Sequence, residues 1–436
     1  MLYYICTMVV LIVGNGGREH ALAWKISQSS LCHELFIAPG NPGTALNGKN
    51  VAIDYNDFEA LSEFCIENNV DLVVVGPETP LVNGIVDVFK TNPNTQHISI
   101  VGPSENGAQL EGSKAFAKEF MKKYQIPTAR YIEVTLENIS EAYEFFNSGH
   151  KPYVLKADGL AGGKGVIILD DENEARATLL DMLNGSFGLA SRKVVIEEFL
   201  DGIEFSVFVL TDGNEYVLLP EAKDYKRIGE GDTGLNTGGM GAVSPVPFVT
   251  SDLMDKVVKK IIKPTIHGIN DQEIDYKGFI FFGLILVNDE PFVIEYNCRL
   301  GDPETEAILP RINEDLLPLL FDAANGGLKA RTLDVLSDSA VTIMLVSNGY
   351  PQKFKKGYPI SNLDSLGDCH AFYAGVAINE TGDIITNGGR VVALTTVAEN
   401  GDIALENSRS AAEKVSFENK YFRRDIGFDL GIGVHQ

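Results

Sequence analysis

The sequence has little cysteine and no excess of positive charge. Its five cysteines are scattered over 436 residues, form no CxxC pair and stand at no zinc-ligand spacing from histidine. With 36 basic and 60 acidic residues the net charge is -24, which disfavours a surface for nucleic acid or an anionic membrane. We therefore expect reduced thiols, a cytoplasmic location and no nucleic-acid partner. Any phosphate site must be local.

The sequence also lacks a long hydrophobic run. The apolar segment at 2–13 is too short to span a membrane, and no basic region precedes it and no small-residue cleavage site follows it. The segment from Met8 to Gly14 instead predicts the first buried strand of a fold. We therefore expect no membrane partner, and we expect residues 1–7 to be a dispensable extension.

The length exceeds what one hydrophobic core organises, so several domains are expected. In the N-terminal quarter apolar runs alternate with helical patterns, which predicts βαβ units and a parallel sheet. A compact region follows Pro127, and hairpins of a larger antiparallel sheet follow from Glu204 onward. A helix is predicted at 403–415. The predicted strands lie at 9–13, 35–38, 72–75, 98–101, 153–157, 166–169, 194–196, 204–210, 216–219, 279–287, 292–296, 341–346, 371–378 and 391–396.

A glycine-rich turn connects the first predicted strand to a helix. Gly14, Asn15, Gly16, Gly17 and Arg18 can present backbone N–H groups and a helix N-terminus to a phosphate. The alternative, that these glycines only make a tight turn, is about equally favoured. The dinucleotide fingerprint needs a third small residue where Glu19 stands and an acid after the second strand, so NAD is disfavoured.

A second loop follows the third predicted strand. Gly76, Pro77 and Glu78 come at its carboxyl end, the edge at which open α/β sheets bind ligands. Two loops at one edge favour a substrate site there.

A glycine-rich hairpin lies between the strands predicted at 153–157 and 166–169. It contains Lys156 and Lys164, but Gly165 follows Lys164 and a strand comes next, so a P-loop is excluded. We expect a hairpin that closes over a triphosphate, with Gly162 and Gly163 allowing close backbone approach. The alternative is a surface turn with two solvated lysines. A second mobile loop is predicted between Gly229 and Gly241, which contains six glycines.

Acidic residues follow the strand at 194–196. Here Glu197, Glu198, Phe199 and Leu200 can offer backbone groups to an adenine, although solvated acids at a strand end are an equal alternative. On the next strand Glu204 can accept hydrogen bonds from ribose hydroxyls.

The strand at 292–296 carries the clearest metal-ligand pattern. By alternation Glu295 and Asn297 emerge on one face, and their oxygens suit a Mg²⁺ ion carried by nucleotide phosphates. Arg299 follows closely, and its planar fork suits a carboxylate substrate. Asp302 precedes Pro303 at a predicted helix start, so we expect a helix N-cap there in preference to a catalytic role.

Together these segments resemble the glycinamide ribonucleotide synthetase family of the ATP-grasp superfamily, over nearly the whole chain. The matching runs are VGNGGREHALAWK, APGN, VGPE, EGSKAF, KADGLAGGKGV, IEEFLDG, DTGLNTGGMGA, IEYNCRLGDPET and NGGRV. The resemblance implies a multidomain α/β and α+β fold with a Rossmann-like (pre-ATP-grasp) N-terminal domain. Its implied limits are 1–109 for that domain, 110–334 for an ATP-grasp core with a mobile lid at about 130–197, and 335–436 for a small C-terminal α/β domain.

The resemblance implies ATP-dependent joining of glycine to 5-phosphoribosylamine through glycyl phosphate, with Mg²⁺ or Mn²⁺, by a monomer. Implied catalytic residues are Lys156, Glu295, Asn297 and Arg299, of which Glu295 and Asn297 hold the metal. Implied ATP contacts are Lys114, Lys156, Gly162, Gly163, Lys164, Gly165, Glu197, Glu198, Phe199, Leu200 and Glu204. Implied substrate contacts are Gly14, Asn15, Gly16, Gly17, Arg18, Pro77, Glu78, Asp224 and Arg299. Lys223 and Tyr225 depart from the family pattern, which has Gln and His there, so neither is given a chemical role.

Three other functions remain open at this point. Another ATP-grasp ligase or a nucleotide carboxylase would use the same ATP motifs with a different acid. A non-catalytic nucleotide-binding regulator is disfavoured because Lys114, Lys156, Lys164, Glu295 and Arg299 are all present. A dehydrogenase rests only on the first glycine turn and is the least favoured.

Overall fold

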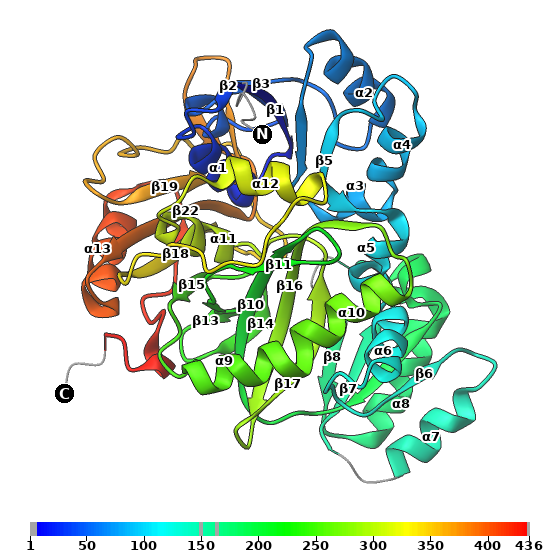
Figure 1. Cartoon of the computed structure of the whole chain (residues 1–436). Coiled ribbons are helices and arrows are strands. Elements are labelled where there is room, and N and C mark those ends of the chain that lie inside the picture. Colours follow the sequence, from blue (N-terminus) through cyan, green and yellow to red (C-terminus); the bar gives the residue numbers. More distant parts are fainter. Residues whose placement is uncertain (1–6, 148–150, 162–164, 434–436) are drawn as a thin grey trace.

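The chain is arranged as three bodies around a central sheet. The computed structural model describes residues 7–147, 151–161 and 165–433. The N-terminal body (blue in Figure 1) and the C-terminal body (orange and red) pack beside the core, and a smaller body (teal) projects at the lower right. The expectation for residues 1–7 falls almost wholly outside the described residues.

The largest sheet joins the N-terminal body to the core. Its order is β11 (Tyr216–Leu218), β10 (Ile203–Thr211), β16 (Tyr276–Val287), β5 (Ser99–Pro103), β4 (Leu72–Val75), β1 (Met8–Gly14), β2 (Cys32–Pro39) and β3 (Lys49–Asn50), and β17 (Glu290–Asn297) pairs with β16. The predicted parallel strands and the predicted antiparallel hairpins are both confirmed. They form one continuous sheet and not two, because Tyr276 and Lys277 pair antiparallel to Pro103 and Gly102.

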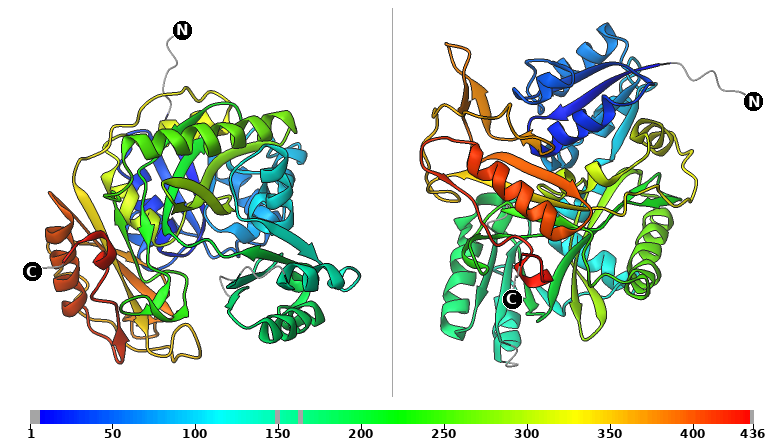
Figure 2. Two further views of the ribbon diagram at one scale, coloured as in Figure 1. Left: turned by 90° about the horizontal axis from the view of Figure 1, so that it is seen from below. Right: turned by 90° about the vertical axis from the view of Figure 1, so that its left-hand side faces the viewer.

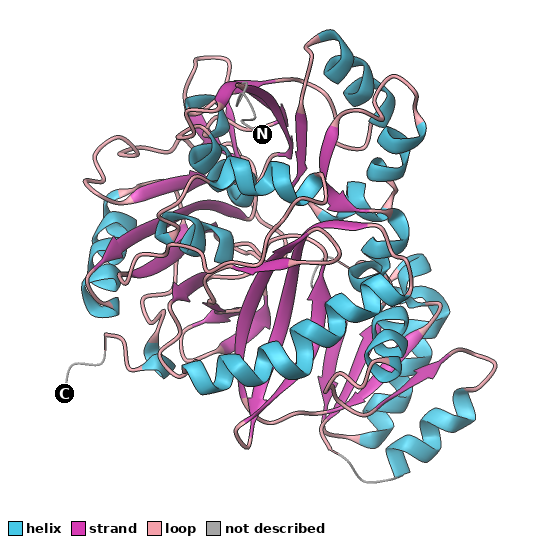
Figure 3. Cartoon of the chain, in the orientation of Figure 1, coloured by secondary structure: helices cyan, strands magenta, loops and turns pink. Residues whose placement is uncertain are grey.

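Helices cover both faces of this sheet (Figure 3). Alternation along β1 explains the two layers: Leu11 and Val13 pack into one buried cluster, and Val10 and Ile12 pack into the other. The first cluster is covered by α2 (Phe58–Glu67), α4 (Ile85–Thr91), α5 (Glu105–Gly112), α6 (Lys114–Lys123), α9 (Ser251–Val257) and α10 (Lys263–Asp271), with the short α3 (Glu78–Val82) nearby. The second is covered by α1 (Gly17–Ile26), α11 (Glu304–Ile308) and α12 (Leu316–Ala324).

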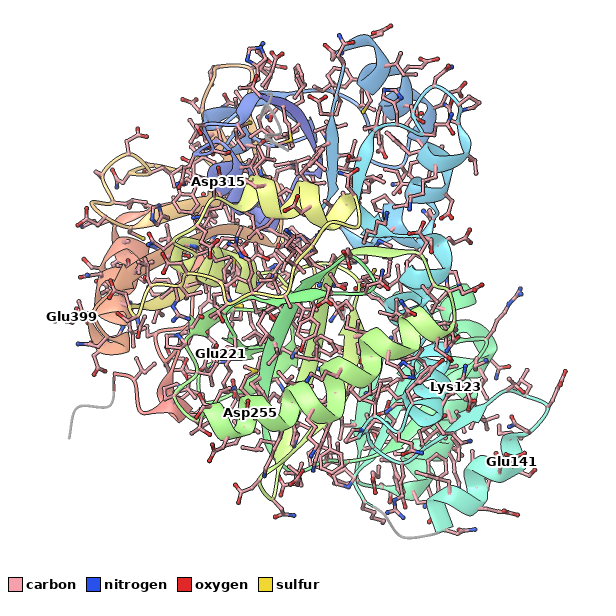
Figure 4. All side chains as sticks on the ribbon, in the orientation of Figure 1. Lys123, Glu141, Glu221, Asp255, Asp315 and Glu399 are labelled. Carbon is pink, nitrogen blue, oxygen red and sulfur yellow. The ribbon has the colours of Figure 1, made fainter. Side chains whose placement is uncertain are left out.

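Polar contacts fix several of these helix ends. Asp315, labelled in Figure 4, accepts hydrogen bonds from the amide of Leu317 at the start of α12 and from the hydroxyl of Ser29, just after α1. Lys123, labelled in the same figure, ends α6 and lies 3.3 Å from the carboxylate of Asp271 at the end of α10. Within the described residues, no helix is both long and apolar enough to cross a membrane.

The projecting body has its own core. Its sheet runs in the order β6 (Tyr131–Val134), β9 (Val194–Glu198), β7 (Tyr153–Ala157) and β8 (Val166–Leu169), with α7 (Ile139–Asn147) and α8 (Glu172–Asp181) beside it. Phe146, Tyr153, Leu155 and Ile196 belong to a buried cluster separate from those of the main sheet. Figure 2 shows this body standing away from the C-terminal body on the opposite side of the core.

The C-terminal body packs around a second sheet. Its order is β12 (Lys223–Asp224), β15 (Gly241–Ser244), β18 (Ser339–Ser347), β22 (Arg390–Ala398) and β19 (His370–Tyr373), with β23 (Lys420–Tyr421) on β18 and α13 (Gly401–Lys414) against it. Two small hairpins lie outside these sheets, β13 (Arg227–Gly229) with β14 (Thr233–Asn236) and β20 (Val376–Ile378) with β21 (Ile384–Thr386).

The single strand predicted at 371–378 is wrong. The structure divides it into β19 and β20, because at Gly375 the chain leaves the sheet and packs directly against the backbone of Gly388. A side chain at Gly375 would collide with that backbone.

Candidate active site

A cavity of about 450 Å³ lies where the core, the N-terminal body and the projecting body meet. Strand β17 supplies one wall and the start of α6 another, and the loop after β17 closes one end. Many of the predicted site residues line it, although they come from distant parts of the sequence. They are Arg18, Pro77, Glu78, Lys114, Gly165, Glu197, Asp224, Glu295, Asn297 and Arg299.

Other predicted residues lie elsewhere. Glu198 turns to Arg130 and accepts hydrogen bonds from its backbone and side chain. The side chains of Phe199, Leu200 and Glu204 do not line the cavity, and Phe199 is 39% exposed. Gly162, Gly163 and Lys164 lie outside the described residues.

A buried network of two lysines and one glutamate forms part of the cavity wall. Lys156 and Lys118 lie 2.9 Å and 3.2 Å from the same oxygen of Glu197, Oε2. Lys118 also donates to the hydroxyl of Thr128 at 2.7 Å. Burial outweighs the attraction of Glu197 and lowers the pKa of Lys118 to about 8.

This network leaves one oxygen of Glu197 open. Glu197 Oε1 is buried and has no hydrogen-bond partner within the described part of the chain. A buried acceptor without a partner is costly, so the arrangement suits a ligand that donates a hydrogen bond there. Lys156 does not line the cavity itself; its ammonium contacts two residues that do, the carboxylate of Glu197 at 2.9 Å and the carbonyl of Ile294 at 3.3 Å.

Glu295 and Asn297 both line the cavity, as alternation along β17 predicted.

Lys226 lies among four carboxylates. Its ammonium is 3.0 Å from Glu204 and 3.2 Å from Asp224, and the charges of Glu295 and Glu304 also attract it. Burial opposes its charge, but these acids raise the pKa of Lys226.

The cavity wall offers few protein ligands for a metal ion. No cluster of three or more His, Cys, Asp or Glu side chains suited to a metal occurs among residues 7–147, 151–161 and 165–433. An all-protein cage is therefore lacking in that part of the chain. A carboxylate and an amide oxygen on one cavity wall fit a divalent ion that takes its other ligands from phosphates and water.

Arg299 is held by two acids and is not free. Its Nε lies 3.2 Å from Glu78 and its Nη2 lies 2.7 Å from Glu111. Although burial opposes ionisation of Glu78, Arg299 and Arg18 lower the pKa of Glu78 to about 2. Glu111 is buried too, and it also accepts a hydrogen bond from the amide of Cys298. The guanidinium is thus fixed at the cavity wall.

The end of the cavity beside Arg299 is acidic. Asp224 and Glu304 both line it, and Glu304 is 4% exposed. Burial, and then the neighbouring Asp224, raise the pKa of Glu304 to about 7. Two carboxylates in one wall favour positively charged or proton-releasing groups on a ligand.

The glycine turn after β1 is largely explained by Glu19. Its carboxylate accepts a hydrogen bond from the amide of Gly16 at 2.6 Å and packs where side chains at Gly14 and Gly76 would lie. The first amide at this helix start is therefore already satisfied inside the protein. Arg18 lines the first cavity, whereas Gly14 and Gly17 are not among the described residues that line it.

A second, more open cavity of about 750 Å³ adjoins the first. It lies between the turn after β1, the loop after β2 and the loop after β19, and it contains Asn15 and Gly16. Only Asp302 and Arg390, among the described residues, line both cavities.

The predicted N-cap at Asp302 is wrong. Helix α11 begins one residue later than expected, its N-cap is Pro303, and no side chain caps it. The Asp302 carboxylate instead lies 3.0 Å from Arg390 of β22, because the charge of this half-buried arginine attracts the acid to the wall between the cavities.

Lys223 and Tyr225 face the C-terminal body and not the cavity. Lys223 lies 3.2 Å from Asp429, and the hydroxyl of Tyr225 donates to the same carboxylate at 2.7 Å. These two departures from the family pattern therefore form one structural cluster.

Several cavity residues were missed by the sequence reasoning: Glu111, Lys118, Lys226, Asp302, Glu304 and Arg390. Glu111 and Glu304 had a signal, because they stand within the matching runs EGSKAF and IEYNCRLGDPET. Arg390 had only the run NGGRV, which by itself gives no indication that it reaches the site from the C-terminal body.

Comparison with known proteins identifies the family to which this fold belongs. Family models match residues 8–111 (phosphoribosylglycinamide synthetase, N domain), 112–305 (its ATP-grasp domain) and 340–429 (its C domain). The fold and the cavity therefore define an ATP-grasp enzyme. Biotin carboxylase from Campylobacter jejuni, 14% identical, shares the fold with a TM-score of 0.71 over 97% of this chain and 94% of that one.

Much higher identity connects the chain to one group of ligases. Phosphoribosylamine–glycine ligase from Pasteurella multocida is 44% identical over 97% of this chain and 98% of its own, and that from Haemophilus influenzae is also 44% identical, with the same coverage. The crystal structure of phosphoribosylamine–glycine ligase from Thermotoga maritima is 35% identical with a TM-score of 0.82, over 95% of this chain and 99% of that one. The chain belongs to the phosphoribosylglycinamide synthetase family.

Proposed function

We propose that this chain joins glycine to 5-phosphoribosylamine in de novo purine biosynthesis. The overall reaction is ATP + glycine + 5-phosphoribosylamine → glycinamide ribonucleotide + ADP + phosphate. The observation that carries the proposal is the first cavity, which unites Lys114, Glu197, Glu295 and Arg299 in a chain that the family models match in all three domains.

The chemistry needs no enzyme nucleophile. A carboxylate oxygen of glycine attacks the γ-phosphorus of ATP and ADP leaves, which gives glycyl phosphate. The nitrogen of the ribosylamine then attacks the carbonyl carbon of glycyl phosphate. The bond between that carbon and the bridging oxygen breaks, and phosphate leaves with the electron pair. Catalysis is positioning and charge neutralisation, as expected for a cavity of lysines, arginines and carboxylates.

Each end of the cavity has a proposed occupant. ATP lies with its adenine near Glu197 and its phosphates near Lys114 and Gly165, which are carried by α6 and the hairpin β7–β8. The amino and carboxylate groups of glycine lie between Asp224 and Arg299. The sugar phosphate enters the second cavity, past Asn15 and Gly16.

Glu295 and Asn297 are the proposed ligands of Mg²⁺ or Mn²⁺, which would neutralise phosphate charge during transfer. Lys156 is proposed to act by holding Glu197 in place. We also propose domain limits of 1–109, 110–334 and 335–436, a lid at about 130–197, a monomer, and a cytoplasmic location; the separate core of the projecting body supports the lid.

The function is tested by measuring ADP release and product mass with each substrate omitted in turn. We expect ADP to accumulate only when glycine and freshly generated phosphoribosylamine are both present. Alanine, serine and bicarbonate replace glycine in parallel reactions. ADP release that requires bicarbonate and ignores glycine would instead identify a carboxylase.

A further inference from the structure

The wall between the two cavities contains a carboxylate, that of Asp302, with one oxygen that accepts no hydrogen bond from the described residues. Asp302 lines both cavities, and its side chain is 13% exposed. Its Oδ1 atom is buried and has no hydrogen-bond partner among the described residues. An unsatisfied buried oxygen of this kind suits a donor that arrives with a ligand.

Arg390 supplies charge to Asp302 but no hydrogen bond. Its Nη1 lies 3.0 Å from Asp302 Oδ1, yet the hydrogens on Nη1 are donated to the backbone carbonyls of Gly238 and Asp302 at 2.6 Å each. Arg390 therefore lies beside the Asp302 carboxylate, but its hydrogens leave the lone pairs of Oδ1 free for another donor.

Buried ionisable groups surround Asp302. Glu306 of α11 is fully buried, and both of its oxygens lack partners in the described structure. Burial and then the neighbouring Asp302 raise the pKa of the Glu306 carboxyl well above its ordinary value, although Arg390 and Arg18 oppose this shift. Arg18 and Arg390 are the cations that face this pair.

Asp302 also borders both of the cavities in which the reactants of the proposed reaction would lie. Its Oδ2 lies 3.5 Å from the position that a Cβ would take at Gly16, in the second cavity. The same residue borders the first cavity beside Arg299 and Glu304. Glu304 lines only the first cavity, so it cannot meet a ligand from both sides.

We propose that Asp302 is a catalytic residue that orients the amine of the ribosyl substrate and accepts its proton. The inference rests on the proposed function. As the C–N bond forms, the nitrogen becomes positively charged; it then loses one proton to the Asp302 carboxylate, while the C–O bond to phosphate breaks and phosphate leaves with the electron pair. Asp302 acts only in this second step.

The test separates the two steps with an alternative nucleophile. Hydroxylamine at high concentration traps glycyl phosphate as glycine hydroxamate and does not need the second cavity. We expect D302N to lower turnover with phosphoribosylamine by about 100-fold or more, the size of a general base effect. Hydroxamate formation from ATP and glycine should change by less than about threefold.

The controls keep the proposal falsifiable. Asp425 is also paired with an arginine, Arg423 at 2.8 Å, but it lines neither cavity, so D425N should change neither reaction. D302A, which also removes the carboxylate, is measured in parallel, in case D302N melts early. Retention of phosphoribosylamine turnover within about threefold in either variant overturns the proposal, and so does an equal fall in both reactions. If wild-type protein forms neither hydroxamate nor product with glycine, the proposed function itself fails.

Discussion

The two ends of the first cavity differ in the charged groups that line them. At one end Lys114, Lys118 and Lys156 lie near one another, and Lys118 and Lys156 share a single carboxylate oxygen of Glu197. Around Lys226, by contrast, Glu204, Asp224, Glu295 and Glu304 surround a single ammonium group. One end suits a polyanion, and the other suits a metal ion and an amine.

The difference teaches how a protein with a net charge of -24 can bind ATP. The cations are few, and several are held by internal acids before any ligand arrives. Glu197 holds Lys118 and Lys156, and Glu78 and Glu111 hold Arg299. Such pairs fix the geometry in advance, which reduces the reorganisation that accompanies the reaction.

The largest effect is expected for Glu295→Gln at the acidic end. The change keeps the size of the side chain and removes a charge that would offset the metal, so turnover should fall by about 100-fold or more. Turnover is measured at saturating and limiting Mg²⁺, with thermal melts to verify folding. Glu290→Gln on the same strand is the control, since Glu290 pairs with Lys256 outside the cavity. Near-normal turnover of Glu295→Gln at limiting Mg²⁺ would show that the metal lies elsewhere.

A smaller effect is expected for Arg299→Lys. A single ammonium group cannot reach Glu78 and Glu111 as the guanidinium does, so the substrate face should lose its geometry. We expect mainly a higher glycine KM, worth about 1.5–3 kcal/mol. Arg176→Lys on α8, which pairs with Glu172, serves as the matched control. An unchanged glycine dependence would exclude Arg299 from the glycine site.

Glu304→Gln tests the acidic end through its pH dependence. Because the folded pKa of about 7 lies above the ordinary 4.5, the folded state keeps a proton that the unfolded chain releases. Stability is therefore full below 4.5 and falls as the pH rises to 7, by up to about 3 kcal/mol. Urea unfolding across this pH range should show a smaller fall in the free energy of unfolding for Glu304→Gln than for the unaltered protein. Equal slopes for both proteins would mean that Glu304 ionises normally.

The smallest effect is expected outside both ends, at Tyr225→Phe. The variant loses the 2.7 Å hydrogen bond to Asp429 and should be destabilised by about 1 kcal/mol. Turnover should stay unchanged, because Tyr225 does not line the cavity. A loss of activity at an unchanged melting temperature would assign this position a role in the reaction.

Much of the fold could be predicted from the sequence. The strands at 72–75, 153–157 and 166–169 match their predicted bounds, because apolar runs rich in β-branched residues and bounded by turns have few other structures available. Glu295 and Asn297 share a wall because a strand has a period of two.

The remaining features depend on contacts between distant segments. Nothing near Asp302 in the sequence indicates that Arg390 lies beside it, so a local capping rule gave the wrong prediction. The union of the two sheets through Tyr276 and Pro103 and the burial of Lys118 against Glu197 are also consequences of tertiary packing. Local pattern cannot reveal such contacts.

The proposed reaction requires that the carboxylate of glycine is phosphorylated before the amine attacks it. The most direct test supplies glycine with a heavy oxygen isotope in its carboxylate and analyses the released phosphate by mass spectrometry. We predict one labelled oxygen in each phosphate, because the oxygen that bridges carbon and phosphorus leaves with phosphorus. Phosphate without label, formed together with glycinamide ribonucleotide, would contradict the account.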